Sequence, residues 1–224
     1  GFGPPAAAGA PPRRAASVGL ARVPVPMASA PAPAPEALLD HRGRERGRYT
    51  TDMTYEQDRL GLAFHEAGHA VLGMAYGMHV HKVEVIAWLS DPYTSHVTGC
   101  TTTEVSNDCD WWEFAAQSAA GTIAQVSYLM AYGLWTPDRA AGCEALHDRD
   151  LAIDVLTERG YRIGTDSVPA GGRSWAMVQG MARRKVTHLW PHIQTVAHAL
   201  FEQSVLTGDD ITGLTGLVNR EVAA

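Results

Sequence analysis

The sequence predicts a mainly α-helical fold with one small β-hairpin near its front. Apolar residues recur at helical spacing in several stretches, and one short run of alternating β-branched residues lies between two of them. Glycine, proline and polar residues separate these stretches and mark loops. The last helix is expected to break at Pro191, because proline has no backbone N–H to donate. The expected helices cover residues 55–75, 110–132, 143–158 and 174–206.

The first helix has recognisable start and stop signals. Thr51 or Asp52 can accept hydrogen bonds from the free N–H groups at its start. Gly77 follows its last apolar residue, and glycine readily adopts the left-handed conformation that ends a helix. We therefore expect this helix to run from Tyr55 to Ala75.

The hairpin follows directly. Residues 80–86 contain four β-branched side chains in partial alternation, which is typical of a strand. Asp91 and Pro92 form a turn signal, and residues 95–104 can return as the second strand.

The first 49 residues have a different composition from the rest. Residues 1–35 are rich in proline and alanine and contain no acidic residue, and the arginine-rich stretch HRGRERGR follows at 41–48. Such a segment has too few large apolar side chains to offset the entropy lost on ordering. We predict a disordered Pro/Ala/Arg-rich tail and linker over residues 1–49 and one folded domain over residues 50–220. An organellar targeting segment is the alternative for this acid-poor leader.

Charge and hydropathy argue against two classes of partner. The net charge is −6, and the densest basic cluster is the short stretch 183–185, so nucleic acid is not an expected ligand. Only residues 111–133 are apolar enough to suggest a membrane span. Glu113, Gln117 and Gln125 interrupt that stretch, which favours a buried core helix.

The cysteines indicate a reducing compartment. There are three of them, an odd number without C-x-x-C spacing, which is not the pattern of a disulfide framework. We therefore expect a cytoplasmic protein.

A metal-binding pattern lies in the first helix. Residues 64–77 read FHEAGHAVLGMAYG and contain H-E-x-x-H. Residues four apart share a helix face, so His65 and His69 can direct two imidazoles at one Zn²⁺ ion. Glu66 then lies beside a water molecule and can act as its general base. The same short pattern can also arise by chance on an ordinary helix, but the apolar flanks favour two interior histidines.

A third ligand must come from elsewhere, because Ala75 replaces the histidine that a metzincin would have there. Residues 143–156 supply several candidates. The residues three, four and seven positions after Asp148 are apolar, which puts Asp148 on the buried face of a helix. Those after Asp150 are mostly polar, and Glu144 shares the face of Asp148. We expect Asp148 as the third ligand, with Glu144 and Asp150 as alternatives.

These segments resemble the peptidase domain of the FtsH-type ATP-dependent zinc metalloproteases. The similarity covers roughly residues 55–217 and is carried by FHEAGHAVLGMAYG, VHKVEVI and GCTTTE, then AAQSAAGTIAQVSYL and AHALFEQSVLTGDDITGL, in that order. In that family an Asp with an Ala four residues later supplies the third zinc ligand, which corresponds to Asp148 and Ala152 here. The resemblance also implies a polypeptide substrate, a separate ATPase partner and a hexameric ring of identical chains.

The chain departs from the family pattern at three places. It has no G-x-x-x-x-G-K-S/T loop of an ATPase module. Gln125 stands where the family usually has an acid. The Gly-Ala that normally precedes the ligand Asp is replaced by EALH, which leaves the choice between Asp148 and Asp150 open.

A few other residues are candidates for a role at the site. A substrate could lie extended along strand 83–86, with Glu84 or Trp88 shaping the groove, although a structural hairpin explains the same residues. His96 could donate a proton to an intermediate. His188 and His192 are four apart, but Pro191 between them favours an ordinary helix bend.

The sequence therefore predicts a zinc metalloendopeptidase. His65, His69 and Asp148 would hold Zn²⁺, and Glu66 would activate water and pass its proton to the leaving amine. The alternatives are a regulatory or scaffold protein that keeps this fold without turnover, and a metallohydrolase of another substrate class.

Overall fold

The computed structural model describes residues 32–46, 52–91 and 94–221. The predicted disorder of residues 1–31 and the turn residue Pro92 lie outside this description. Six α-helices, one 3₁₀ turn and five strands make up the described part. The helices are α1 (Tyr55–Ala75), α2 (Trp111–Ala131), α3 (Pro137–Gly142), α4 (Leu146–Glu158), α5 (Trp175–Gln203) and α6 (Gly208–Thr215), with η1 (Pro35–Leu38) before them. The strands are β1 (His79–Asp91), β2 (Thr94–Glu104), β3 (Ile163–Gly164), β4 (Arg173–Ser174) and β5 (Val205–Thr207).

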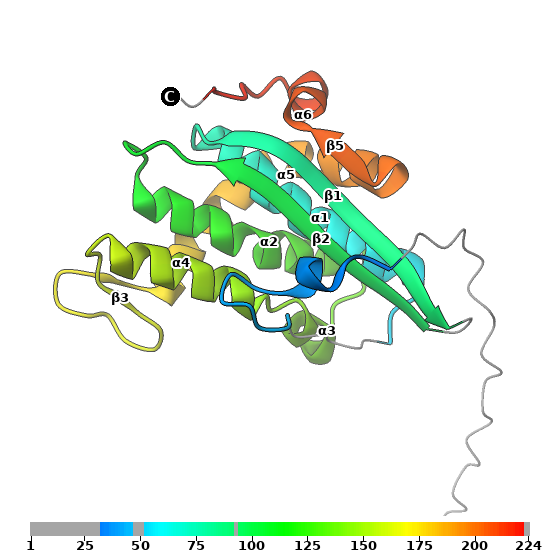
Figure 1. The fold of residues 1–224 in the computed structure, drawn as a ribbon, viewed down its shortest axis with the longest axis horizontal. Coiled ribbons are helices and arrows are strands. Elements are labelled where there is room, and N and C mark those ends of the chain that lie inside the picture. The colour runs from blue at the N-terminus through cyan, green and yellow to red at the C-terminus, as the bar shows by residue number, and fades with distance from the viewer. Residues whose placement is uncertain (1–31, 47–51, 92–93, 222–224) are drawn as a thin grey trace, which may run out of the picture.

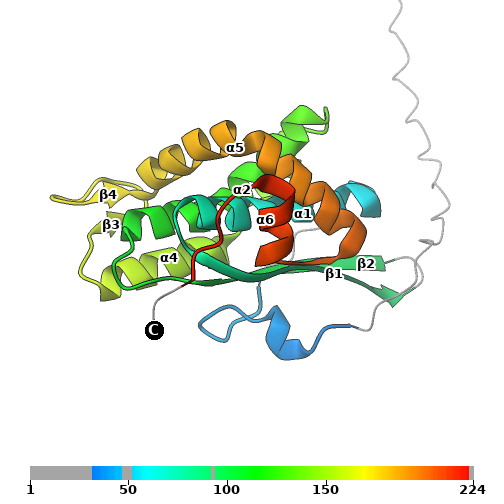
Figure 2. The ribbon, with the colours of Figure 1, turned by 90° about the horizontal axis from the view of Figure 1, so that it is seen from above.

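The described chain is mainly helical with a small antiparallel sheet, as predicted. Helices α1, α2 and α5 lie on one face of the sheet formed by β2, β1 and β5 (Figures 1 and 2). Helix α4 packs against α2 beyond the free side of β2 (Figure 1). No helix in the described ranges is long and apolar enough to cross a membrane.

Helix α1 forms the centre of the core. It is buried almost without interruption from Ala63 to Met74. Gly68 allows α2 to approach closely, because an added methyl group would overlap Ala124 and the carbonyl of Ala120. The long helix α5 packs against α1 and α2 from the other side and closes the core.

The start of α1 differs from the prediction, although its bounds agree with it. Thr54 caps the helix, accepting a hydrogen bond from the backbone N–H of Gln57, whose side chain accepts one from the backbone N–H of Thr54. Such a reciprocal capping box satisfies two free N–H groups at once. Asp52 instead pairs with Arg139, and Thr51 lies outside the described residues.

Two later helices also differ from the prediction. Of the expected helix 143–158, only residues 146–158 are helical, as α4, and the short helix α3, which was not predicted, precedes it over residues 137–142. The expected break at Pro191 is wrong, because α5 continues through this residue to Gln203. Pro191 is solvent-exposed, and the packing of the buried residues on both sides of it holds the helix together.

The sheet contradicts the idea that residues 83–86 offer a free strand edge. Strand β1 pairs with β2 along its whole length, from His79 opposite Glu104 to Asp91 opposite Thr94. Its other side pairs with β5 at residues 82–84, and the N–H of Val85 donates to Ser204. Strand β1 is therefore central, and the edge strand on the side of α4 is β2.

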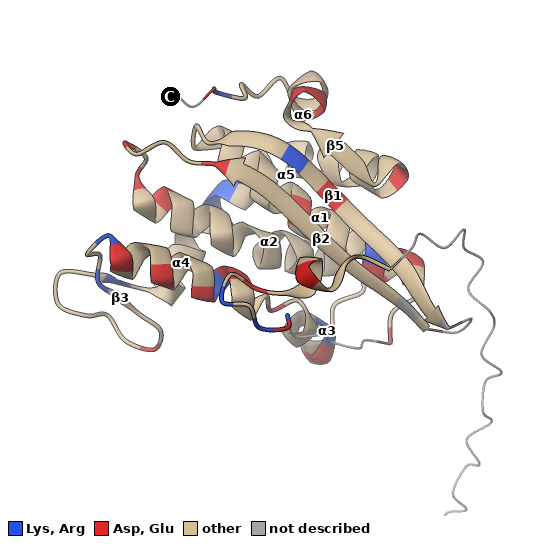
Figure 3. Ribbon diagram, viewed as in Figure 1, with Lys and Arg blue, Asp and Glu red and all other residues tan. Residues whose placement is uncertain are grey.

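The arginine-rich stretch that was expected to be part of a linker is folded against α4 as far as Arg46. We call residues 35–46 the strap. Its backbone closes on itself through hydrogen bonds from Asp40 N–H to the Arg44 carbonyl and from Arg46 N–H to the Leu38 carbonyl. Figure 3 shows the arginines of the strap beside the acidic residues of α4. Opposite charges on two segments distant in sequence thus bring the strap to the side of the domain that carries the histidines.

Candidate metal centre

Three potential ligands converge between α1 and α4. The Nε2 atoms of His65 and His69 lie 3.1 Å apart. Oδ2 of Asp148 lies 3.1 Å from Nε2 of His65 and 3.2 Å from Nε2 of His69. Both imidazoles are buried, and the aspartate is only slightly exposed. This group could hold a metal ion.

The other nitrogen of each imidazole is already engaged by α2. Nδ1 of His69 donates to the backbone carbonyl of Gln117 over 2.8 Å. Nδ1 of His65 donates to Oε1 of Gln125 over 3.2 Å. With the proton on Nδ1, a neutral imidazole presents a lone pair at Nε2. Two lone pairs and a carboxylate oxygen then face one point, an arrangement of acceptors that a cation satisfies.

The spacing of the three atoms also fits a small ion. Bonds of about 2.0–2.2 Å to nitrogen and oxygen place the corners of a tetrahedron about 3.3 Å apart. The observed separations of 3.1–3.2 Å are close to that value. Gly121 of α2 lies directly against the pair, since an added methyl group would overlap Nε2 of both His65 and His69. The residues present therefore fit a bound metal.

The titration of the group reflects the mutual attraction of its members. Burial alone would lower the pKa of His69, but the charge and hydrogen bond of Asp148 raise that pKa to about 9. Burial would raise the pKa of Asp148, yet the histidines, His69 first, hold it well below its usual value. Without metal, a protonated His69 thus balances the charge of the Asp148 carboxylate.

The structure distinguishes the three candidate third ligands by position. Asp148, in the first turn of α4, is the acid that reaches the histidines. Asp150 faces the strap, with Oδ2 3.0 Å from Nη2 of Arg44. Glu144 precedes the helix and is largely exposed.

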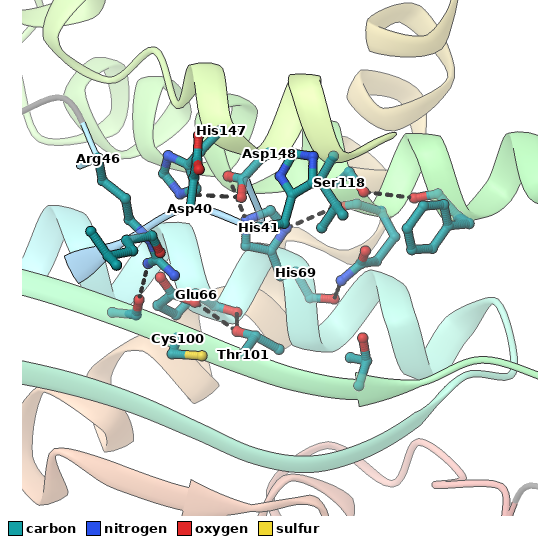
Figure 4. Close-up of a pocket in the computed structure, with 16 residues that line it drawn as sticks. Asp40, His41, Arg46, Glu66, His69, Cys100, Thr101, Ser118, His147 and Asp148 are labelled. Carbon is teal, nitrogen blue, oxygen red and sulfur yellow. Dashed lines mark hydrogen bonds and ion pairs between the residues drawn. The ribbon is translucent and has the colours of Figure 1, made fainter. Parts of the chain in front are cut away.

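Glu66 lies on the wall of a cavity that also exposes the metal group. Its Oε2 accepts a 2.7 Å hydrogen bond from the hydroxyl of Thr101 on β2. Gly99, two residues earlier on β2, leaves room for it, because an added methyl group would overlap the Glu66 carboxylate. Figure 4 shows Glu66 between this strand and the metal group. The side chain is therefore held at the cavity by the edge strand.

The cavity has a volume of about 380 Å³ and is bounded by five parts of the chain. Helix α1 and strand β2 form one side, α2 and α4 the other, and the strap adds residues at its mouth (Figure 4). Its polar lining residues include Asp40, His41, Arg46, Glu66, His69, Thr101, Gln117, Ser118, His147 and Asp148.

Sequence reasoning missed the supporting residues on α2. Gln117, Gly121 and Gln125 are spaced four apart, so they share the helix face that meets His65 and His69. Two amides flanking a glycine on one face of an otherwise apolar helix could have indicated this role. Gln125, which in the sequence is a polar interruption of this helix and a departure from the FtsH pattern, accepts a hydrogen bond from the candidate ligand His65.

The remaining sequence candidates lie elsewhere. Glu84 pairs with Lys82 on β1 over 3.0 Å. Trp88 stacks on His96, whose Nε2 lies 2.9 Å from the Ser90 hydroxyl. His188 and His192 on α5 are not part of the metal-binding group either. Comparison with known proteins found no family model that matches the chain and no match among curated proteins.

Proposed function

We propose that this protein is a zinc-dependent metalloendopeptidase. Two imidazoles and one carboxylate alone do not decide between zinc and iron, because non-haem iron enzymes use the same donors. The observation that carries the proposal is Glu66, a carboxylate beside the ligands that faces the same cavity. Hydrolysis needs a base at that place.

His65, His69 and Asp148 would hold the zinc ion. When bound, zinc polarises a carbonyl oxygen and lowers the pKa of the water bound to it to about 7. The acceptors on α2 keep both Nδ1–H groups engaged, which preserves Nε2 for the metal.

Glu66 would do the proton transfers. Its carboxylate takes a proton from the attacking water as the new C–O bond forms at the scissile carbonyl carbon. It then gives that proton to the peptide nitrogen as the C–N bond breaks, so the amine leaves neutral. The Thr101 hydroxyl orients the carboxylate by donating to Oε2, which leaves Oε1 for the water.

The substrate would lie along β2 rather than β1. Strand β2 is the sheet edge beside Glu66, and backbone groups at an edge can pair with an extended peptide of varied sequence. Such pairing suits a polypeptide substrate. The resemblance to FtsH-type peptidases extends the proposal to a ring of six chains and an ATPase that acts as a separate partner.

Hydrolysis of fluorescently labelled, unfolded casein tests the proposal. The zinc-loaded 224-residue protein is expected to cleave it, and Glu66→Gln should lower the rate by about 100-fold or more because the base is lost. Glu84→Gln, which removes the carboxylate paired with Lys82 on β1, is the matched control and should retain activity. Zinc content is measured for all three proteins. No cleavage by the parent with one zinc per chain would contradict the proposal and favour the scaffold alternative.

A further inference from the structure

The strap brings one arginine to the cavity mouth. Arg46 is half-buried, and its guanidinium donates from Nε to the Leu39 carbonyl over 3.1 Å and from Nη1 to the Gly99 carbonyl over 3.2 Å. Gly99 belongs to the edge strand β2 and touches Glu66. Figure 4 shows the Arg46 side chain reaching from the strap toward Glu66 and this strand.

Arg46 differs from the other two arginines of the strap. Arg42 binds Asp154 through Nε over 2.7 Å, and Arg44 binds both Asp40 and Asp150. Arg46 makes no ion pair with any Asp or Glu whose side chain the structure describes, and the two side-chain hydrogen bonds that it makes to described residues go to backbone carbonyls. A guanidinium has five N–H donors, so several of them are left for a ligand.

None of the acids that line the cavity forms an ion pair with Arg46. Glu66 accepts from Thr101, Asp148 faces the histidines, and Asp40 accepts from Arg44. The Arg46 guanidinium at the cavity therefore has no carboxylate partner among the described residues. A guanidinium fork matches a carboxylate in shape and charge and can bind it through two parallel hydrogen bonds.

We propose that Arg46 is a specificity-determining residue that binds a carboxylate of the substrate. This inference rests on the proposed peptidase function. A peptide paired with the outer edge of β2 would pass Gly99, which lies beside both Arg46 and Glu66. The carboxylate that Arg46 binds would therefore belong to a peptide residue close to the scissile bond. The group is either an Asp or Glu side chain or a free C-terminal carboxylate. The protein as a whole is acidic, with a net charge of −6, so a preference for acidic peptides must come from a local cation.

The strap ion pairs position Arg46 for this role. Arg42 and Arg44 attach the strap to Asp150 and Asp154, on successive turns of the helix that carries Asp148. Helix α4 therefore holds both Arg46, through the strap, and the third metal ligand, Asp148. This common support fixes the distance between the bound carboxylate and the metal site.

A binding experiment without turnover tests the assignment. The probes are fluorescent alanine- and leucine-based decapeptides with one Glu or one Gln at each position in turn, each made with a C-terminal acid or amide. Their dissociation constants are measured by anisotropy on zinc-loaded Glu66→Gln protein. At least one carboxylate peptide should bind about tenfold or more tightly than its neutral match, as expected for charge-assisted hydrogen bonds. The position of the Glu, or the C-terminal acid, identifies which carboxylate is bound.

Adding Arg46→Gln should reduce that preference to less than about threefold. Arg46→Lys keeps the positive charge but lacks the planar guanidinium, so it should give an intermediate preference. It also keeps the test valid if Arg46→Gln does not fold. Arg183→Gln removes an exposed arginine of α5 and should keep the full preference. No preference for any carboxylate peptide, or a preference that survives Arg46→Gln, overturns the assignment.

Cleavage of the same peptides by protein with Glu66 intact separates the two proposals. Selective binding without hydrolysis by this parent would reject the peptidase function, and with it a role of Arg46 in substrate specificity, while carboxylate binding by Arg46 would stand. Hydrolysis of acidic and neutral peptides at equal kcat/KM, unchanged in ratio by Arg46→Gln, would reject the role of Arg46 alone.

Discussion

The orientation of both histidines depends on single atoms of α2. Each Nδ1–H has one acceptor, the Gln117 carbonyl for His69 and the Gln125 side chain for His65. A backbone carbonyl cannot be removed by substitution, whereas the Gln125 amide can. A substitution can therefore remove the acceptor that orients His65, but not the one that orients His69.

Replacing Gln125 tests this support. Gln125→Ala should weaken zinc binding by about 10- to 100-fold, because the His65 ring loses the bond that fixes its tautomer and orientation. Gln125→Glu retains an acceptor and adds a negative charge, so it should bind zinc at least as tightly as the parent. Competition with a chromogenic chelator measures both affinities. Equal affinity for Gln125→Ala and parent would contradict the role of the amide.

Gly121 tests how closely α2 must approach the ligands. Gly121→Ala would place a methyl group against Nε2 of both His65 and His69, so the imidazoles or the helix must move. We expect zinc binding to fall by more than about 100-fold while the helical circular dichroism signal remains, since each ligand is needed for affinity.

Gly180→Ala is the matched control on α5. An added methyl group there meets no atom within 4 Å, and alanine in a helix interior is worth about 0.5–1 kcal/mol over glycine. This variant should be more stable than the parent with unchanged zinc affinity. Normal zinc binding by Gly121→Ala would show that the close contact is not a constraint.

At the scale of the element, the strap is the part of the molecule held mainly by charge. Hydrogen bonds of Arg42, followed by His41, lower the pKa of Asp154 to about 2. Burial opposes the change at Asp40, but hydrogen bonds of Arg44 and the backbone N–H of Arg42 still lower its pKa to about 2. The ionised form of Asp154 is thus stabilised by the docked strap, and that of Asp40 by partners within the strap itself.

These shifts set the pH range in which the strap should release. A depressed pKa means that the contribution of Asp154 to docking, and of Asp40 to the conformation of the strap, is complete above the ordinary value of 3.8 and is lost as pH falls through about 2. Hydrogen exchange of the metal-free protein, corrected for intrinsic rates, should therefore show a loss of protection at the amides of Asp40 and Arg46 that begins below pH 3.8 and is largest near pH 2.

Two variants separate this effect from general acid unfolding. Asp154→Asn should reproduce part of the loss of strap protection at pH 5, because the partner of Arg42 and His41 is gone. Asp209→Asn, an exposed change at the start of α6, should not. Equal strap protection in all three proteins at pH 5 would contradict docking by charge.

At the scale of the whole molecule, features that depend on neighbouring residues could be predicted from the sequence, whereas features that depend on contacts between distant segments could not. The bounds of α1 and the grouping of His65 with His69 follow from helical spacing and end signals within about twenty residues. The pairing of β5 with β1 and the docking of Arg42 on Asp154 join segments more than 100 residues apart, and no local pattern encodes them. The continuity of α5 through Pro191 likewise comes from tertiary packing.

The same long-range assembly predicts that one part of the molecule depends on a metal bound to the candidate site. Helix α1 has thirteen buried residues, whereas α4 buries only Ala152 and Leu156. Apolar burial therefore holds α1 firmly and α4 weakly. A metal ion bound to His65, His69 and Asp148 would join the two helices, and the strap is attached to α4 through Asp150 and Asp154.

Removal of the metal should accordingly loosen α4 and the strap before the core. Metal at about 1,000 times its dissociation constant stabilises the folded state by about 4.1 kcal/mol, so a chelator should lower the Tm of the loaded protein clearly. Hydrogen exchange after chelation should rise in residues 146–158 and 35–46 and change little in α1, α2 and α5. In Asp148→Asn, which lacks the ligand from α4, the chelator should have a much smaller effect on exchange in both segments. A uniform rise across the chain would mean that the metal supports the core itself, and no change in α4 would mean that Asp148 does not join the two helices through the ion.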